Sequence, residues 1–242
     1  MTGRASFSGI HVRISKSFGN GGSLVDILVY RQYSKQTLTF PSEYSVARPS
    51  QTVEQSKKLL PIVCEVFSEL GYRRTTTAEL AHRCDVRENI LYRLWPDKKA
   101  MFLAAIDDIF RSRAEVWNEI LADRPAPEQA VERIIEYESH HQGESGFYRI
   151  VFTALTETDD DDIRVAVVGM YRRFHQLVCR QIETGHGSGD LESGLPTEMA
   201  AWGLLGLATI SNIIRELKLL PTRQRERMFA TVAKCLVGGK IS

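Results

Sequence analysis

The chain lacks the features of membrane proteins and of disulfide-rich secreted proteins. No stretch of its 242 residues approaches the roughly 20 apolar residues that a membrane-spanning helix needs, and the first residues contain no continuous apolar signal-peptide core. The four cysteines (Cys64, Cys84, Cys179 and Cys235) are far apart and form no Cys-x-x-Cys pair, which argues against a disulfide framework or a thiolate metal site. We therefore expect a cytoplasmic protein with small, buried, structural thiols.

Net charge is also nearly absent. The formal charge of +1 at pH 7 gives no whole-molecule attraction to nucleic acid or to a membrane, so any polyanion-binding surface must be local. Because 43% of the residues are hydrophobic and 25% are charged, the composition is that of a folded globular protein.

Residues 1–55 differ from the rest of the chain. They are rich in Gly, Ser, Thr and Gln, and their short apolar runs alternate instead of recurring at helical spacing. Isolated short strands are only marginally stable. We predict a flexible or disordered N-terminal extension, or translated sequence upstream of the true start, whose basic residues would contact DNA weakly at most.

From Leu59 onward the spacing of apolar residues is helical, and no strand pattern competes with it. A first helical face ends at Gly71, and we expect the regular helix to begin close to Pro61, which lacks a backbone donor. Further helices are expected over roughly 98–122, 126–142, 145–157, 161–185, 197–219 and 222–237, with Gly or Pro at the breaks. The sequence predicts an all-α fold.

Two short helices lie between the first helix and residue 98. Thr76 can cap one of them, and Glu79, three residues later, can complete a capping box. The other is expected over residues 87–94. Ala81 is small where the two helices must approach closely, and Asp85, which tolerates a left-handed backbone, lies at the turn. This spacing predicts a helix-turn-helix.

The same region resembles the DNA-binding domain of TetR-type (tetracycline-repressor-like) regulators. The matching residues are Phe67-Ser-Glu-Leu-Gly-Tyr72, Thr75-Thr76, Leu80-Ala81, Val86, Leu91-Tyr92 and Trp95-Pro-Asp-Lys98. The chain departs from the family pattern at Asp85, Arg87, Leu94 and Trp95, where the family usually has Gly, Ser or Thr, His and Phe. The resemblance implies a helix-turn-helix DNA-binding domain over residues 56–101 and a helical ligand-binding and dimerisation domain over 102–242.

The resemblance also implies which side chains contact DNA. Residues 87–94 would enter the major groove, where the candidates for reading base edges are Arg87, Glu88, Asn89 and Arg93. The positions that the family uses for phosphates are Thr76, Tyr92 and Lys98. Residues 57–99 hold nine basic and six acidic side chains, a local excess that suits a polyanion.

Residues 199–219 are apolar on almost every side, more than the single stripe of a surface helix. A homodimer through residues 197–237 would cover them and would suit a palindromic operator. The alternative is burial of both faces within one subunit.

The family resemblance implies an effector pocket among the remaining helices. Candidate ligand contacts are Trp117, Tyr137, His141, Phe152, Tyr171 and His175. No metal or cofactor is expected, because Asp159–Asp162 suits a solvated helix cap and His140-His141 lack metal-ligand spacing.

The function expected from these features is a transcriptional regulator, most simply a repressor that a small molecule releases from its operator. Two other classes stay open: a helical protein-interaction adaptor that does not bind DNA, and an enzyme, for which no nucleophile, paired carboxylate or cofactor loop can be recognised.

Overall fold

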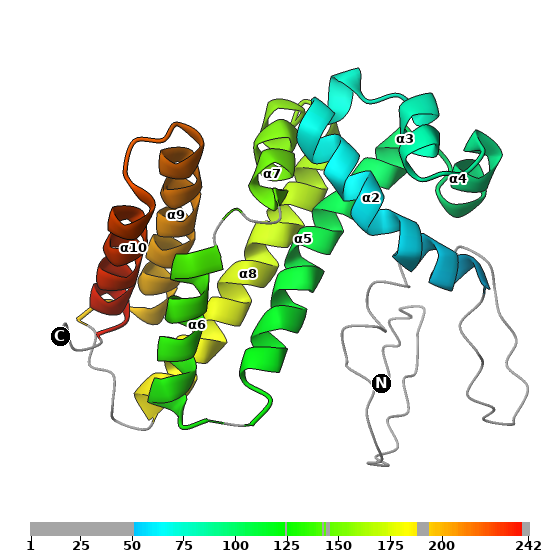
Figure 1. The fold of residues 1–242 in the computed structure, drawn as a ribbon. Helices are drawn as coiled ribbons and strands as arrows, with labels where there is room; N and C mark the ends of the chain where they lie inside the picture. The colour runs from blue at the N-terminus through cyan, green and yellow to red at the C-terminus, as the bar shows by residue number, and fades with distance from the viewer. Residues whose placement is uncertain (1–50, 124, 142, 144–145, 188–193, 239–242) are drawn as a thin grey trace, which may run out of the picture. The chain divides into compact units, whose positions relative to one another are not determined.

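A computed structural model of the chain describes residues 51–123, 125–141, 143, 146–187 and 194–238, which belong to one compact unit, Ala47–Ser242 (Figure 1). The elements in these ranges are all helical: α2 (Gln51–Arg74), α3 (Thr77–Arg83), α4 (Glu88–Leu94), α5 (Lys98–Ile120), α6 (Pro127–His141), α7 (Phe147–Thr156), α8 (Asp161–Gly187), α9 (Thr197–Glu216) and α10 (Thr222–Val237). The all-α prediction is confirmed, as are the helices predicted after residue 97. The predicted extension lies outside the described residues, except that residues 51–55 are helical.

The expectation that the first helix begins near Pro61 was wrong. α2 begins at Gln51, ten residues earlier, and Pro61 lies inside it on an exposed position. A proline inside a helix removes one hydrogen bond, but here the carbonyl that loses its partner lies on the solvent side, where water can bind it. Burial of Leu59, Leu60 and Val63 around the proline stabilises the helix through this turn.

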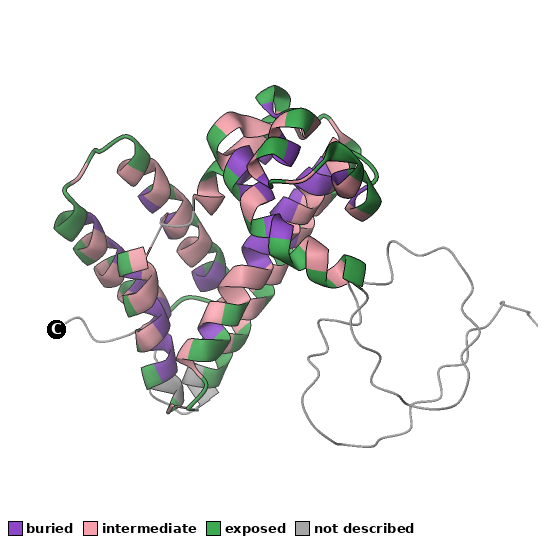
Figure 2. Ribbon diagram, turned by 45° about the vertical axis from the view of Figure 1, so that its right-hand side comes forward, coloured by how far each residue is buried: buried purple, intermediate pink, exposed green. Residues whose placement is uncertain are grey.

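A first hydrophobic cluster joins the helix-turn-helix to the helices behind it. α2 packs against both α5 and α7, and the buried rings of Phe67 and Phe102 meet edge to face at 4.9 Å. Leu80 of α3 and Leu91 of α4 are fully buried in the same cluster. The buried ribbon segments therefore concentrate where α2 crosses α5 (Figure 2). The three N-terminal helices α2, α3 and α4 share their core with α5, α7 and the first half of α8.

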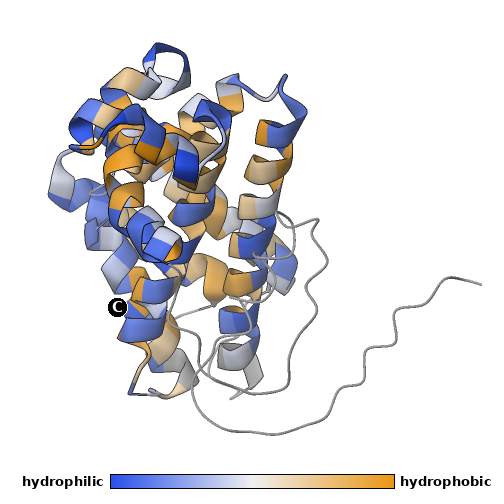
Figure 3. Ribbon diagram, turned by 90° about the vertical axis from the view of Figure 1, so that its right-hand side faces the viewer, coloured by the Kyte–Doolittle hydropathy of each residue, from blue (hydrophilic) through white to orange (hydrophobic). Residues whose placement is uncertain are grey.

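A second hydrophobic cluster lies at the other end of α5. Trp117 of α5 packs with residues of α6, α9, α10 and the second half of α8, and Leu177 of α8 touches both clusters. Hydrophobic and hydrophilic segments alternate along the helical ribbons (Figure 3). α5 and α8 therefore run through both clusters and join them.

The cysteines only partly match the prediction of buried thiols. Cys64 and Cys84 are buried, Cys179 is half-buried and Cys235 is exposed. Burial raises the pKa of the Cys64 thiol, which contacts Asp108 between α2 and α5. The prediction was wrong for Cys235 because the outward face of α10 carries it.

None of the described helices is long and apolar enough to cross a bilayer.

Candidate nucleic-acid interface and ligand cavity

The turn between α3 and α4 has the geometry that a helix-turn-helix requires. Thr76 Oγ1 accepts a hydrogen bond of 3.1 Å from the Glu79 amide, which is one half of the predicted capping box. Asp85 takes a left-handed backbone with φ of 53°, and the Val86 amide then donates to the Ala81 carbonyl at 3.0 Å. The predicted role of Asp85 is confirmed, and the turn fixes the direction of α4.

α4 buries one face and exposes the other. Leu91 is completely buried, whereas the predicted base-contacting residues Arg87, Glu88, Asn89 and Arg93 are all exposed, as is Tyr92. Arg87 is the N-cap residue, in extended conformation and without a side-chain cap hydrogen bond. The structure therefore brings these predicted side chains together on one solvent-facing surface, which we call the α4 face.

Two side chains of the α4 face are held by neighbours. Tyr92 Oη donates to Thr77 Oγ1 at 3.1 Å, which ties α4 to the start of α3. Arg93 donates to Gln55 Oε1 at 2.8 Å, across the first turns of α2. Gln55 was missed by sequence reasoning, because those turns were assigned to the N-terminal extension. Thr76, the N-cap residue of α3, immediately precedes Thr77 in the sequence and is exposed.

Lys98 is placed differently from the other predicted phosphate contacts. Its Nζ donates to the carbonyls of Tyr72 and Thr75, both at 3.0 Å, and lies 4.5 Å from the centre of the Tyr72 ring. The backbone of α2 is kinked at Gly71, and these hydrogen bonds satisfy carbonyl groups that follow the kink. Lys98 therefore fixes the α2–α3 connection to the start of α5.

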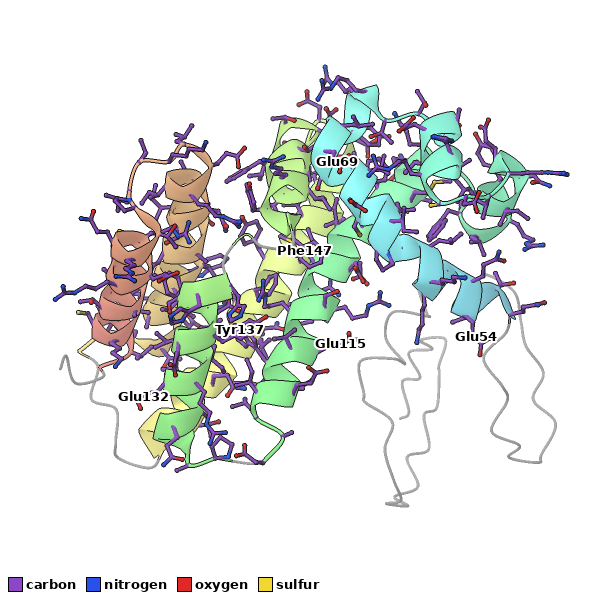
Figure 4. The ribbon with its side chains drawn as sticks, in the orientation of Figure 1. Glu54, Glu69, Glu115, Glu132, Tyr137 and Phe147 are labelled. Carbon is purple, nitrogen blue, oxygen red and sulfur yellow. The ribbon has the colours of Figure 1, made fainter. Side chains whose placement is uncertain are left out.

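An ion pair orients α3 on α2. Arg83 binds Glu69 at 2.8 Å and lies 3.6 Å from Glu65. The hydrogen bond from Arg83 lowers the pKa of the Glu69 carboxyl below its ordinary value. Both acidic residues are on exposed turns of α2, where Figure 4 labels Glu69.

A cavity of about 210 Å³ lies between the two hydrophobic clusters. Its walls come from α5, α6, α8, α9 and α10 together with the first part of α7, and most of the side chains that line it are apolar or aromatic. Three of the predicted ligand contacts, Trp117, Phe152 and Tyr171, line it. Phe147, which Figure 4 labels at the start of α7, lines it as well.

The other predicted ligand contacts lie outside the residues that line this cavity. Tyr137 and His141, one turn apart on α6, stack on each other with ring centroids 4.1 Å apart. Figure 4 labels Tyr137 on α6. His175 of α8 stacks on Trp202 of α9 at 4.6 Å. The first pair stacks within one helix, whereas the second packs α8 against α9.

The cavity wall also contains polar groups that the sequence did not point to. Glu138 accepts a hydrogen bond of 2.7 Å from Trp117 Nε1 and lies 3.4 Å from Arg113. Asn212, near the end of α9, donates through Nδ2 to the Ala208 carbonyl at 2.9 Å. Periodicity could not reveal these groups, because polar side chains at such spacing are ordinarily solvent-exposed.

α7 lies between the cavity and α2. Phe147, Val151 and Phe152 line the cavity, whereas Ile150 and Ala154 are fully buried in the cluster shared with α2. The contact with α2 is close, since a Cβ added at Gly146 of the α7 N-cap would lie 3.1 Å from Ser68 Oγ. At its other end α7 is followed by Glu157, which binds Arg73 at 2.7 Å. One short helix therefore contacts both the cavity and α2, against which α3 and α4 pack.

An apolar stripe remains uncovered on α9. Met199, Trp202, Ile210 and Leu217 recur along one side of the helix, and Trp202 is 50% exposed. The two glycines of the helix differ: a Cβ on Gly203 would contact Leu236 of α10 at 3.1 Å, whereas one on Gly206 would meet nothing within 4 Å. α10 covers one side of α9, and among the described residues this outer stripe stays largely exposed to solvent.

The acidic run before α8 forms a helix cap. Asp160 Oδ1 accepts from the amides of Asp162 and Ile163, at 3.0 and 3.2 Å. Lys99 of α5 binds both Asp160 and Asp162. The predicted cap is confirmed for Asp160, and the described part of the chain contains no group of three or more His, Cys, Asp or Glu side chains arranged for a metal ion.

Comparison with known proteins agrees with this geometry. Residues 64–105 match the family model described as "Bacterial regulatory proteins, tetR family". They span the second half of α2, the helix-turn-helix and the start of α5, so the family relationship found in the sequence is confirmed for this domain. No curated protein sequence matches the chain.

Solved structures share the fold beyond this domain. A TetR-family regulator from Cytophaga hutchinsonii is 12% identical and has a TM-score of 0.66, with 81% of this chain and all of that chain covered. A regulator from Saccharomonospora viridis in complex with choline is 16% identical with a TM-score of 0.63, over 73% of this chain and 94% of that one.

A third structure, FadR from Bacillus subtilis in complex with stearoyl-CoA, is 15% identical with a TM-score of 0.61, over 76% of this chain and 99% of that one. All three are described as transcriptional regulators. At identities this low, the likeness establishes the fold. The shared fold extends beyond the helix-turn-helix to the helices that line the cavity.

Proposed function

We propose that the chain is a cytoplasmic, ligand-responsive DNA-binding transcriptional regulator. The chain joins a TetR-type helix-turn-helix to further helices with the fold of this family's regulators. The observation that carries the proposal is the α4 face. It presents arginine, asparagine and tyrosine side chains on a short helix whose opposite side carries the completely buried Leu91. A helix of this kind fits the major groove, where such side chains read base edges.

The candidate contacts divide into two classes. Arg87 and Asn89 are exposed on the first turn of α4, where they can pair with guanine and adenine in bidentate fashion. Thr76 and Tyr92, both exposed, are the proposed phosphate contacts, and the Arg93–Gln55 hydrogen bond orients Arg93 on the α4 face. Lys98 holds the α2–α3 connection through its hydrogen bonds to the carbonyls of Tyr72 and Thr75. Its third N–H can donate to a phosphate.

Binding to fluorescent duplexes tests these roles. Arg87→Ala or Asn89→Ala should lower affinity for the preferred sequence by about 1–3 kcal/mol and relax the preference at one base pair. Tyr92→Phe should weaken preferred and random duplexes alike. Arg180→Ala, an exposed arginine on α8, is the matched control. If all these variants bind as the wild type does, α4 is not the reading helix and the adaptor class moves forward.

We propose that the regulator is a homodimer through α9 and α10, within the predicted range 197–237. The outer stripe of α9 is apolar, uncovered and continuous with the α9–α10 contact, and a pair of such helices from each subunit forms a four-helix interface. A two-fold dimer presents two α4 faces to a palindromic operator.

The cavity is the proposed effector site, and α7 is the proposed link to DNA. An effector that favours a different position of α7 would move α2, and with it the packed α3–α4 pair. The simplest outcome is repression relieved by the effector. Titration of an effector into the protein–DNA complex should lower operator affinity by about 5-fold to 150-fold. An effector that fills the cavity and leaves operator affinity unchanged would contradict this coupling.

A further inference from the structure

The cavity wall carries no unbalanced charge. Among the described residues that line it, only Arg113 and Glu138 are of acidic or basic type, and their side chains form an ion pair of 3.4 Å. Trp117 Nε1 donates to the same carboxylate. Both ionised side chains are largely buried, with 17% and 15% of their surface exposed. Because they neutralise each other, a charged ligand would lose its hydration without gaining a counter-ion.

The size of the cavity limits its occupant. A dry apolar cavity of about 150 Å³ accommodates benzene. At about 210 Å³, this cavity has room for one substituted ring or a small bicyclic molecule. A long acyl chain bearing a large polar headgroup would not fit without rearrangement of the walls.

One hydrogen-bond acceptor in the wall lacks a donor. Asn212 lines the cavity, and its Nδ2 donates to the Ala208 carbonyl, which fixes the orientation of the amide because a carbonyl oxygen can only accept. Its Oδ1 is buried and has no hydrogen-bond partner among the described residues. This oxygen lies beside Gly143, also a lining residue, where an added Cβ would be 3.0 Å from it and closer still to a guanidinium nitrogen of Arg215. Leaving such an acceptor unmet is unfavourable.

We propose that the cavity binds a compact, uncharged and largely apolar molecule carrying one hydrogen-bond donor, a hydroxyl or an N–H, which donates to Asn212 Oδ1. This assignment rests on the proposed function, because it names the class of effector that the cavity takes. The apolar body lies against the aromatic side chains of α7 and α8, and the donor is directed to the end of α9. A phenol or a cyclic alcohol has this chemistry.

Direct binding to the full chain, without DNA, tests the assignment. The probes are 4-ethylphenol, ethylbenzene, 1-ethyl-4-methoxybenzene and 4-ethylbenzoate, with affinity measured by calorimetry and by the fluorescence of Trp117 in the wall. 4-Ethylphenol should bind about 3-fold to 10-fold more tightly than ethylbenzene, the range expected for one neutral hydrogen bond. The methoxy compound accepts but cannot donate, so it should gain nothing over ethylbenzene. The anionic benzoate should bind most weakly.

The variant Asn212→Leu should abolish the preference for 4-ethylphenol and keep the affinity for ethylbenzene. Asn118→Leu, the same change on an exposed turn of α5, should leave the preference intact. Equal binding of the phenol and the hydrocarbon by the wild type would show that Oδ1 finds its donor elsewhere, and would overturn the assignment. So would tighter binding of the benzoate, or no binding of any probe.

These outcomes are separable from failure of the proposed function. Loss of DNA binding would leave the probe affinities unchanged, whereas failure of the ligand class would leave DNA binding intact.

Discussion

At the scale of single residues, backbone conformation explains positions that side-chain chemistry does not. Gly71 interrupts α2 with φ of 72° and ψ of 171°, a region that essentially only glycine occupies. The kink turns the chain so that Thr75 can hydrogen-bond to the Gly71 carbonyl at 2.7 Å and Lys98 can reach the carbonyls of Tyr72 and Thr75. The orientation of the helix-turn-helix on α2 therefore depends on one glycine.

Replacing this glycine should destabilise the fold. We expect Gly71→Ala to lower the free energy of unfolding by about 1–3 kcal/mol, because alanine would be strained at this φ and ψ. Urea denaturation measures the change. Gly169→Ala is the control, since Gly169 lies in α8 with nothing within 4 Å of an added Cβ, and helix propensity there favours alanine by about 0.5–1 kcal/mol. Equal effects of the two substitutions would refute the importance of the kink.

The cap of α8 gives a prediction for acidic pH. Hydrogen bonds from the Ile163 amide, and then from Lys99, hold the pKa of Asp160 below its ordinary value. A folded-state pKa below the unfolded one stabilises the protein above the unfolded value, and this contribution is lost as the pH falls through the folded value. Asp160→Ala should therefore lower the unfolding temperature at neutral pH and lessen its decline below about pH 4.

Thermal unfolding followed between pH 3 and pH 6 measures this difference. Asp159→Ala is the matched control, because Asp159 is an exposed neighbour outside the cap hydrogen bonds. If both variants decline with pH as the wild type does, the cap contributes nothing to acid stability.

At the scale of elements, the uncovered stripe of α9 predicts the oligomeric state. Ile210 lies in the middle of the stripe, so Ile210→Glu should place an unpaired carboxylate in the dimer interface and give a folded monomer. Light scattering coupled to size exclusion measures the mass. Leu155→Glu, at an exposed position on α7, should leave the dimer intact. A wild-type chain that is monomeric at micromolar concentration would contradict the interface.

Helical periodicity and capping residues predicted the elements well, because these signals are local. Thr76, Asp85 and Asp160 each act within a few residues of their own position in sequence. The start of α2 was missed, because the cost of Pro61 is local and is offset by packing of α2 against helices much later in the chain.

Because sequence signals are local, they also limited how much of the candidate site could be predicted. The exposed residues of α4 could be predicted because one short helix carries them. The cavity could not be assigned residue by residue: an aromatic side chain at helical spacing lines it in the case of Phe152 and packs outside it in the case of Tyr137. Only the tertiary structure distinguishes the two, and only it brings Asn212 to the wall.

At the scale of the whole molecule, the two hydrophobic clusters hold different parts of the protein together. The first holds the helix-turn-helix, the second holds the α9–α10 pair, and the cavity lies between them with α7 against α2. A change in the cavity can therefore reach the α4 face through contiguous packing. Coupling of this kind requires two arrangements of α7 with different affinities for the ligand.

Filling the cavity should mimic the effector. Ala208→Phe introduces a ring at the cavity wall, so we expect it to prevent effector binding and to lower operator affinity by about 5-fold or more. Ala122→Phe, at an exposed position after α5, is the control. Fluorescence anisotropy measures the affinity, and circular dichroism verifies the fold. A filled cavity with unaltered operator affinity would separate the cavity from DNA binding.

The measurement that tests the central claim most directly is selection of genomic fragments by the purified full-length chain, followed by titration of the retained fragment against random DNA and salt. The account predicts an inverted repeat with half-sites one helical turn or a multiple apart. It should be bound at least about 1000-fold more tightly than random DNA, with affinity falling steeply as salt rises. A folded protein that enriches no sequence and binds DNA without salt dependence would contradict the account and favour a protein-interaction adaptor or an enzyme.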